Sequence, residues 1–244
     1  MTSKGYEKNV YLAMLAEQCN RFEEMTNFLE EMLKSREKDL NADERNLLSI
    51  AYKNSVSTRR TALRTIMAYE MKERKKEAST FLPYIQEYRK RVEDELTKMC
   101  NGVLVTIDDH LLKRAEDDEA KVFYWKMKGD YNRYVAEYAT GELKDKVSNA
   151  ALNSYKSAVE AAKNLSAINP IYLGLSLNFT VFYYEVLNDH ETACKIAKDT
   201  LDHANKENPN IDEEDESQRD AYSIINLLKE NLEMWKLEAE EGNN

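Results

Sequence analysis

The chain has 244 residues, of which 33% are charged and 42% hydrophobic, and its formal net charge is -10. This composition excludes a disordered chain, and the acidic balance makes general binding to nucleic-acid phosphates unfavourable. No stretch approaches the roughly 18 consecutive apolar residues of a membrane span. The first residues are polar and charged, unlike a signal peptide, and the cysteines suit a reducing compartment. We expect a cytoplasmic protein without a nucleic-acid partner or a membrane span.

Glycine and proline are rare, with 6 and 3 residues in the whole chain. Sandwiches, barrels and α/β folds need many more turn residues, so the sequence predicts an all-α fold. Short connections make neighbouring helices antiparallel, and Asn41, Asp189 and Asp212 are suitable N-caps. Breakers and turn clusters divide the chain into nine expected helices, at about 6–20, 22–37, 43–75, 79–110, 117–140, 142–165, 170–187, 190–206 and 217–238.

The sequence offers no constellation typical of an enzyme. It has no glycine-rich phosphate loop and no nucleophile elbow. The three histidines share no metal-binding spacing and have no obvious triad partners. Cys19, Cys100 and Cys194 are far apart and form no CxxC, which gives neither a disulfide framework nor a zinc site. We expect a non-catalytic protein without a metal or cofactor.

A stripe of cations lies on the helix expected at 43–75. Lys53, Arg60 and Arg64 are separated by 7 and 4 residues, which places them within an arc of about 40° on a helix. No acidic residue lies three or four positions from any of them, so the helix offers no i,i+3 or i,i+4 partner. The stripe is therefore an anion site, a solvated face, or a surface paired with another helix.

The helix expected at 117–140 adds a second group of polar residues. Asp130 and Arg133 are three residues apart and can pair, and Lys126 lies one turn before Asp130. Tyr134 brings a hydroxyl on an apolar ring. The alternative interpretation is an ordinary amphipathic helix, because aromatic residues at helical spacing usually belong to the core.

Two further helices combine amides with apolar stripes. In the mostly apolar helix at 170–187, Asn178 shares a stripe with Val181 and Glu185. A buried Asn is costly unless it is hydrogen-bonded, so it either binds a ligand backbone or is satisfied within the core. The helix at 217–238 has a similar stripe, made of Ile224, Leu227, Asn231 and Trp235. Two such helices facing the cations would form an amphipathic groove.

Five motifs, in order along essentially the whole chain, resemble those of 14-3-3 proteins. They are LAEQCNRFEEM at 15–25, RNLLSIAYKN at 45–54 with the arginine pair at 59–60, KVFYWKMKGDYNRYVAE at 121–137, NPIYLGLSLNFTVFYYEVLN at 169–188, and LLKENLEMW at 227–235. The resemblance implies a cup-shaped subunit of nine antiparallel helices with an amphipathic groove. It implies a single domain at 1–238, with a dimerisation half and basic groove wall at 1–111 and the rest of the groove at 112–238. A short acidic tail at 239–244 would follow.

The same resemblance implies a function, namely an adaptor that binds phosphoserine- or phosphothreonine-containing client proteins. It assigns the phosphate to Lys53, Arg60, Arg133 and Tyr134. It assigns the bound peptide to Arg64, Lys126, Asn178, Glu185, Asn231 and Trp235, with an apolar wall of Leu177, Val181, Ile224 and Leu227. The alternative function is a helical scaffold that binds unphosphorylated segments.

The resemblance also implies a homodimer or a heterodimer with related chains. Its contacts would join Arg21 to Glu95 and Glu24 to Arg91 between subunits, with Tyr88 packed nearby. The alternative is ordinary surface charge on these helices, because the sequence pattern by itself would not select these pairs.

Overall fold

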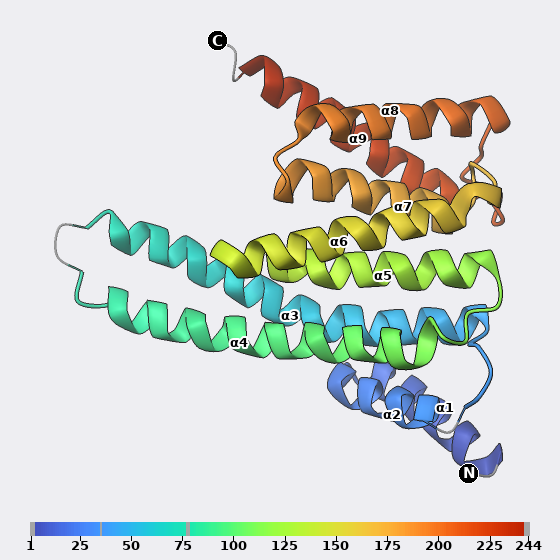
Figure 1. Ribbon diagram of the computed structural model, residues 1–244, viewed down its shortest axis with the longest axis horizontal. Helices are drawn as coiled ribbons and strands as arrows, with labels where there is room; N and C mark the ends of the chain where they lie inside the picture. The colour runs from blue at the N-terminus through green and yellow to red at the C-terminus, as the bar shows by residue number, and fades with distance from the viewer. Residues whose placement is uncertain (1–2, 35, 77–78, 242–244) are drawn as a thin grey trace. The chain divides into compact units, whose positions relative to one another are not determined.

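The computed structural model describes residues 3–34, 36–76 and 79–241. Over these residues the chain forms nine α-helices and no strand, which confirms the all-α prediction. None of the helices in this part of the chain is long and apolar enough to cross a membrane. The helices are α1 (Ser3–Gln18), α2 (Phe22–Lys34), α3 (Ala42–Arg74), α4 (Leu82–Thr106), α5 (Asp118–Ala136), α6 (Gly141–Ala161), α7 (Pro170–Val181), α8 (His190–Glu207) and α9 (Arg219–Glu241) (Figure 1).

The helices belong to two compact units, Met1–Ala115 and Glu116–Asn244. In the first unit α3 and α4 run side by side in opposite directions, and α2 packs against both α1 and α3 (Figure 1). Its core includes the fully buried Leu29, Leu48 and Leu96, one each from α2, α3 and α4. These three helices therefore share one apolar centre.

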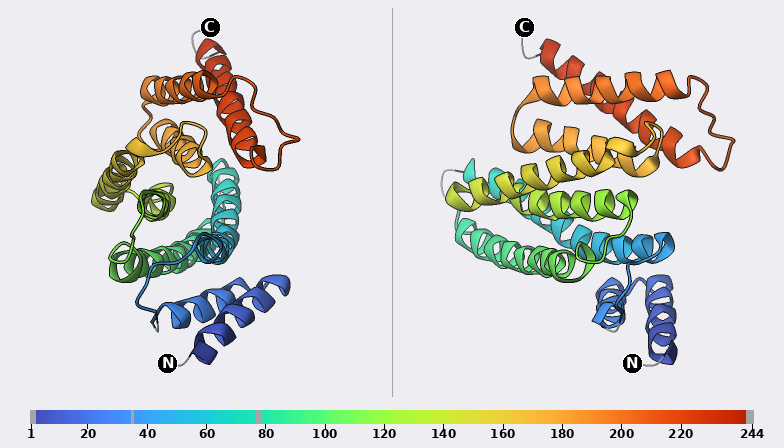
Figure 2. Two further views of the ribbon diagram at one scale, coloured as in Figure 1. Left: turned by 90° about the vertical axis from the view of Figure 1, so that its right-hand side faces the viewer. Right: turned by 45° about the vertical axis from the view of Figure 1, so that its right-hand side comes forward.

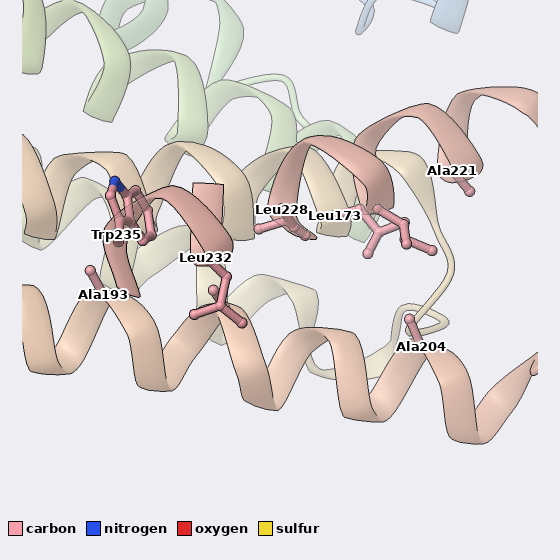
Figure 3. Close-up of a cluster of buried hydrophobic side chains, with 9 residues drawn as sticks. Leu173, Ala193, Ala204, Ala221, Leu228, Leu232 and Trp235 are labelled. Carbon is pink, nitrogen blue, oxygen red and sulfur yellow. The ribbon is translucent and has the colours of Figure 1, made fainter. Parts of the chain in front are cut away.

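The second unit contains two apolar clusters that meet on α7. One cluster packs α7 against α8 and α9, with Leu173, Leu228 and Trp235 among its members (Figure 3). The other includes Tyr155 and Phe182 and joins α7 to α5 and α6. The antiparallel pairs α5–α6 and α7–α8 and the crossing helix α9 are visible in Figure 2. An almost wholly apolar α7 is explained by this double burial.

Two of the three predicted N-caps are confirmed. The Asn41 side chain accepts a hydrogen bond from the Glu44 amide, and the Glu44 carboxylate accepts one from the Asn41 amide, both at 2.9 Å. The Asp189 carboxylate caps α8. The prediction for Asp212 is wrong, because its carboxylate closes a local turn and α9 begins only at Arg219. An Asp can serve either structure, and the sequence pattern does not separate them.

Several helix ends differ from the expected ones. The helices α4 and α7 each end in a π-helical turn, Ile107–Leu111 and Phe182–Val186, where a regular α-helix was expected. A five-residue π turn does not change the hydrophobic pattern enough to be read from sequence. Helix α9 continues to Glu241, so the first three residues of the expected tail are helical, and residues 242–244 lie outside the described residues.

Candidate functional site

The predicted cationic stripe lies on the surface of the first unit. Lys53 and Arg64 are exposed on α3, and Arg60 is half-buried. The same helix buries a different set of positions, including Tyr52 and Val56, against the core. The stripe is therefore a polar face of α3, separate from the positions that this helix buries in the core.

In the second unit the centre of the polar group is Asp130 on α5, only 5% exposed. Its Oδ1 accepts hydrogen bonds from the Tyr155 hydroxyl at 2.6 Å and from the Asn178 amide at 2.8 Å. Its Oδ2 accepts from the same amide at 3.0 Å and from Lys126 Nζ at 3.1 Å. Arg133 Nη2 lies 3.5 Å from Oδ1. One buried carboxylate thus gathers polar side chains from α5, α6 and α7.

These partners keep Asp130 ionised. Burial on its own would raise the pKa of the carboxyl group, because it disfavours the charged form. The charges of Lys126 and Arg133 and the hydrogen bond from Tyr155 outweigh that effect and hold the pKa of Asp130 below its usual value. Asp130 is therefore a permanent internal counter-ion at neutral pH.

Arg133 is 6% exposed and is held along its length. Its Nε donates to the Tyr155 hydroxyl at 3.1 Å, and its guanidinium lies 4.8 Å from the centre of the Tyr134 ring. Among the described residues its two terminal nitrogens make long contacts, with Nη2 3.5 Å from Asp130 and Nη1 3.5 Å from Glu137. Burial acts to lower the pKa of Arg133, but Tyr155 and Asp130 raise it well above its ordinary value. A charged guanidinium group that is held in one orientation, and whose terminal nitrogens make long hydrogen bonds, is suited to bind an anion in a bidentate way.

Tyr155 is the residue that sequence reasoning missed. It is completely buried on α6, and the centre of its ring lies 5.2 Å from the ring centre of Phe179 and 5.4 Å from that of Phe182. An aromatic residue in an amphipathic helix normally indicates core, so the pattern gave no reason to choose it. The one available signal was Gly129 inside α5, because a glycine in a helix often marks a close approach. A Cβ there would lie 2.7 Å from the Tyr155 ring.

The predicted apolar wall is partly assembled within the second unit. Leu177 and Val181 on α7 and Ile224 on α9 are half-buried and pack against the same α7–α8–α9 cluster. Leu227 on α9 is 47% exposed, a large value for a leucine. The two helices thus present apolar side chains beyond what their own packing buries.

The remaining peptide-binding candidates have different environments. Asn231 is half-buried on α9, and Glu185 is exposed on the π turn that follows α7. Trp235 is only 3% exposed and stacks on Tyr184, with ring centres 4.5 Å apart. Trp235 therefore belongs to the core of the α7–α8–α9 cluster (Figure 3).

The predicted dimer residues form pairs within their own unit. Arg21 is ion-paired with Glu24, and Arg91 Nε lies 3.9 Å from Glu95 Oε1. The Arg91 guanidinium also lies 5.1 Å from the centre of the Tyr88 ring. All four charged side chains are at least 45% exposed, and Tyr88 is 49% exposed. Such exposed local pairs contribute little to stability and can exchange partners readily.

Comparison with known proteins identifies the family. The 14-3-3 protein family model matches residues 12–236. The chain is 46% identical over 239 residues to 14-3-3-like protein A of Hordeum vulgare, covering 97% of this chain and 90% of that protein. It is 46% identical over 235 residues to 14-3-3-like protein GF14 nu of Arabidopsis thaliana, covering 96% and 88%. It is 45% identical over 232 residues to the 14-3-3 protein homolog of Trichoderma harzianum, covering 95% and 87%. The chain therefore belongs to the 14-3-3 protein family.

Proposed function

We propose that the protein is a phosphoserine- and phosphothreonine-dependent adaptor that binds client proteins and alters their activity, conformation or location. Membership of the 14-3-3 family supports a phosphopeptide-binding adaptor role in general. The observation that carries the proposal is the buried guanidinium of Arg133, whose two terminal nitrogens lie 3.5 Å from their partners Glu137 and Asp130 in the described part of the chain. We propose that it acts in the cytoplasm, without catalysis and without a cofactor.

The phosphate ligands in this proposal are Lys53, Arg60, Arg133 and Tyr134. A phosphoserine carries about -1.5 to -2 charges and three acceptor oxygens. Arginine forks bind such a group in a bidentate way, while a lysine adds a point charge and a tyrosine hydroxyl one donor. An unphosphorylated serine offers these four side chains no charge and only one hydroxyl oxygen as an acceptor. The site therefore distinguishes the two forms of a client.

The peptide chain is proposed to bind beside the phosphate. Lys126 and Asn178 already point at the Asp130 carboxylate, which orients both side chains before any ligand arrives. An ammonium group has three donors, so its contact with Asp130 leaves capacity for a ligand carbonyl. The other proposed contacts are Arg64, Glu185, Asn231 and the indole N–H of Trp235, together with the apolar wall of Leu177, Val181, Ile224 and Leu227.

We further propose one 14-3-3 domain over residues 1–238 that dimerises, with itself or with a related chain, through residues 1–111. Arg21 would pair with Glu95 of the second subunit and Glu24 with Arg91, next to Tyr88. Two hollows support this choice of surface. One of about 410 Å³ is lined by Arg21 and Glu24 among others, and one of about 670 Å³ by Glu95 among others. Open hollows beside exposed charges suit a partner helix.

The decisive test is a fluorescence-polarisation titration with one peptide in two forms. The peptide has basic residues before the serine and a proline two residues after it, and is used phosphorylated and unphosphorylated. We expect tight binding of the phosphorylated form only, weakened on the order of a hundredfold by Lys53→Glu, which places repulsion where a cation stood. The matched control is Lys72→Glu, exposed on the same helix but about 80° around it from Arg64.

Equal binding of the two peptide forms would contradict the proposal and favour the alternative, a scaffold for unphosphorylated segments. That alternative predicts loss of affinity on Leu227→Asp and no response to Lys53→Glu. The pair of variants therefore separates recognition by charge from recognition by apolar surface alone.

A further inference from the structure

The Tyr155 hydroxyl bridges two buried charges. It donates to Asp130 Oδ1 at 2.6 Å and accepts from Arg133 Nε at 3.1 Å. A hydroxyl can do both only while it is protonated, and burial together with the Asp130 charge raises the pKa of Tyr155 well above its ordinary value. The bridge is therefore intact at neutral pH, and its partners make both bonds charge-assisted.

The bridge acts on one particular atom of Arg133. A guanidinium is planar, so a bond at Nε fixes the plane in which Nη1 and Nη2 lie. It also keeps Nε away from Asp130, whose contact with this guanidinium is the 3.5 Å separation from Nη2. We infer that Tyr155 is a positioning residue for Arg133, which holds the terminal nitrogens ready for a phosphate.

Without the hydroxyl, the geometry would change in a specific direction. Asp130 Oδ1 would lose its bond of 2.6 Å, and Arg133, whose Nη2 lies 3.5 Å from the same oxygen, is a charged donor able to replace it. A closer Asp130–Arg133 pair would occupy the nitrogens that a phosphate needs. The phosphate would then have to compete with an internal carboxylate, and affinity would fall although every proposed phosphate ligand is still present.

The ring of Tyr155 is held by packing contacts that do not involve its hydroxyl, so the hydroxyl can be tested separately. It packs against Phe179 and Phe182, and Gly129 makes room for it on α5. Tyr155→Phe keeps the ring and removes only the bridge. Tyr183→Phe is the matched control, since the Tyr183 ring contacts the same two phenylalanines at 4.8 and 6.2 Å.

The experiment is a double-mutant cycle on the full chain, read by titration with the phosphopeptide described above. We expect Tyr155→Phe to weaken binding about five- to tenfold, an effect the size of one ordinary hydrogen bond, because the hydroxyl orients Arg133 and does not itself touch the ligand. In the Arg133→Lys background, which lacks the Nε donor, the same substitution should change affinity less than about twofold. Tyr183→Phe should change neither. Gly129→Ala displaces the Tyr155 ring but keeps its hydroxyl. It should weaken binding in the protein that has Arg133 and have little effect in the Arg133→Lys background.

Each outcome decides something. Equal losses in the two backgrounds would mean a general structural defect and would overturn the positioning role, as would unchanged affinity of the Tyr155→Phe variant. The inference rests on the proposed function, because Arg133 is a proposed phosphate ligand. If the unmodified chain does not prefer the phosphopeptide, both fail; if it does and Tyr155→Phe has no effect, only the inference fails.

Discussion

The side-chain amide of Asn178 donates to both carboxylate oxygens of Asp130, at 2.8 and 3.0 Å, and so joins α7 to α5 at a buried charge. This bond holds the amide in a fixed orientation. It also supplies two of the hydrogen bonds that a buried carboxylate needs. Asn178 therefore has a structural role in addition to the ligand-binding role proposed for it.

Replacing Asn178 should affect both roles. Asn178→Ala should lower the free energy of unfolding by about 1–2 kcal/mol, because a buried ionised acceptor loses a donor. It should also weaken phosphopeptide binding. Urea denaturation and the peptide titration measure the two effects. The control is Asn164→Ala, whose amide donates to Asp118 at 3.2 Å on the exposed surface; an equal loss of stability there would contradict this account.

Asp130 makes stability depend on pH. Its pKa in the folded protein lies below the ordinary value of 3.8, so its contribution is fully present above that value and is lost as the pH falls through the folded pKa. Asp130→Asn removes the buried carboxylate that Lys126 and Arg133 share and should cost about 3 kcal/mol near neutral pH. The difference in stability between the two proteins should shrink as the pH is lowered below about 4.

Denaturation of both proteins across this pH range checks the prediction. Asp94→Asn provides the control, because it alters only an exposed pair with Lys90, and its effect should stay small throughout. If the stability difference between the unmodified protein and Asp130→Asn stays the same at acidic pH, the substitution acts through packing rather than through charge.

Polar residues that lie close together on one helix could be predicted from sequence, whereas contacts between side chains of different helices could not. The Lys53, Arg60 and Arg64 stripe follows from spacing alone, and the Asp130–Arg133 pair follows from an i,i+3 separation. The contacts of Tyr155 and Asn178 with Asp130 span 25 and 48 residues, and no local pattern encodes such distances. Even the resemblance to the family, which supplied most site residues, gave no role to Tyr155.

The space beside Gly129 gives a prediction with an unusual sign. Alanine normally stabilises a helix relative to glycine by about 0.5–1 kcal/mol. At Gly129 the added Cβ would lie 2.7–2.8 Å from three atoms of the Tyr155 ring, so Gly129→Ala should instead destabilise the protein by about 1–3 kcal/mol. Gly174→Ala, on α7 with nothing within 4 Å of its Cβ, should be neutral or stabilising. Thermal unfolding of the two variants measures the contrast, and matching shifts of the same sign would refute it.

The charges proposed for the dimer offer a swap experiment. Within one subunit Arg21 pairs with Glu24 and Arg91 with Glu95, whereas the proposed dimer pairs Glu24 with Arg91 of the second subunit. Arg91→Glu should weaken dimerisation at low salt, because it would face the carboxylate of Glu24. Adding Glu24→Arg to that variant should restore it, since the pair is re-formed with its charges exchanged.

The local pairs make the opposite prediction for the same double variant. Glu24→Arg places a second cation beside Arg21, and Arg91→Glu places a second carboxylate beside Glu95, so both local pairs stay broken. Sedimentation equilibrium of the two single variants and the double variant, at low and high salt, separates the cases. Recovery of the dimer in the double variant requires a contact between subunits, and additive weakening would mean that these four residues serve only their own helices.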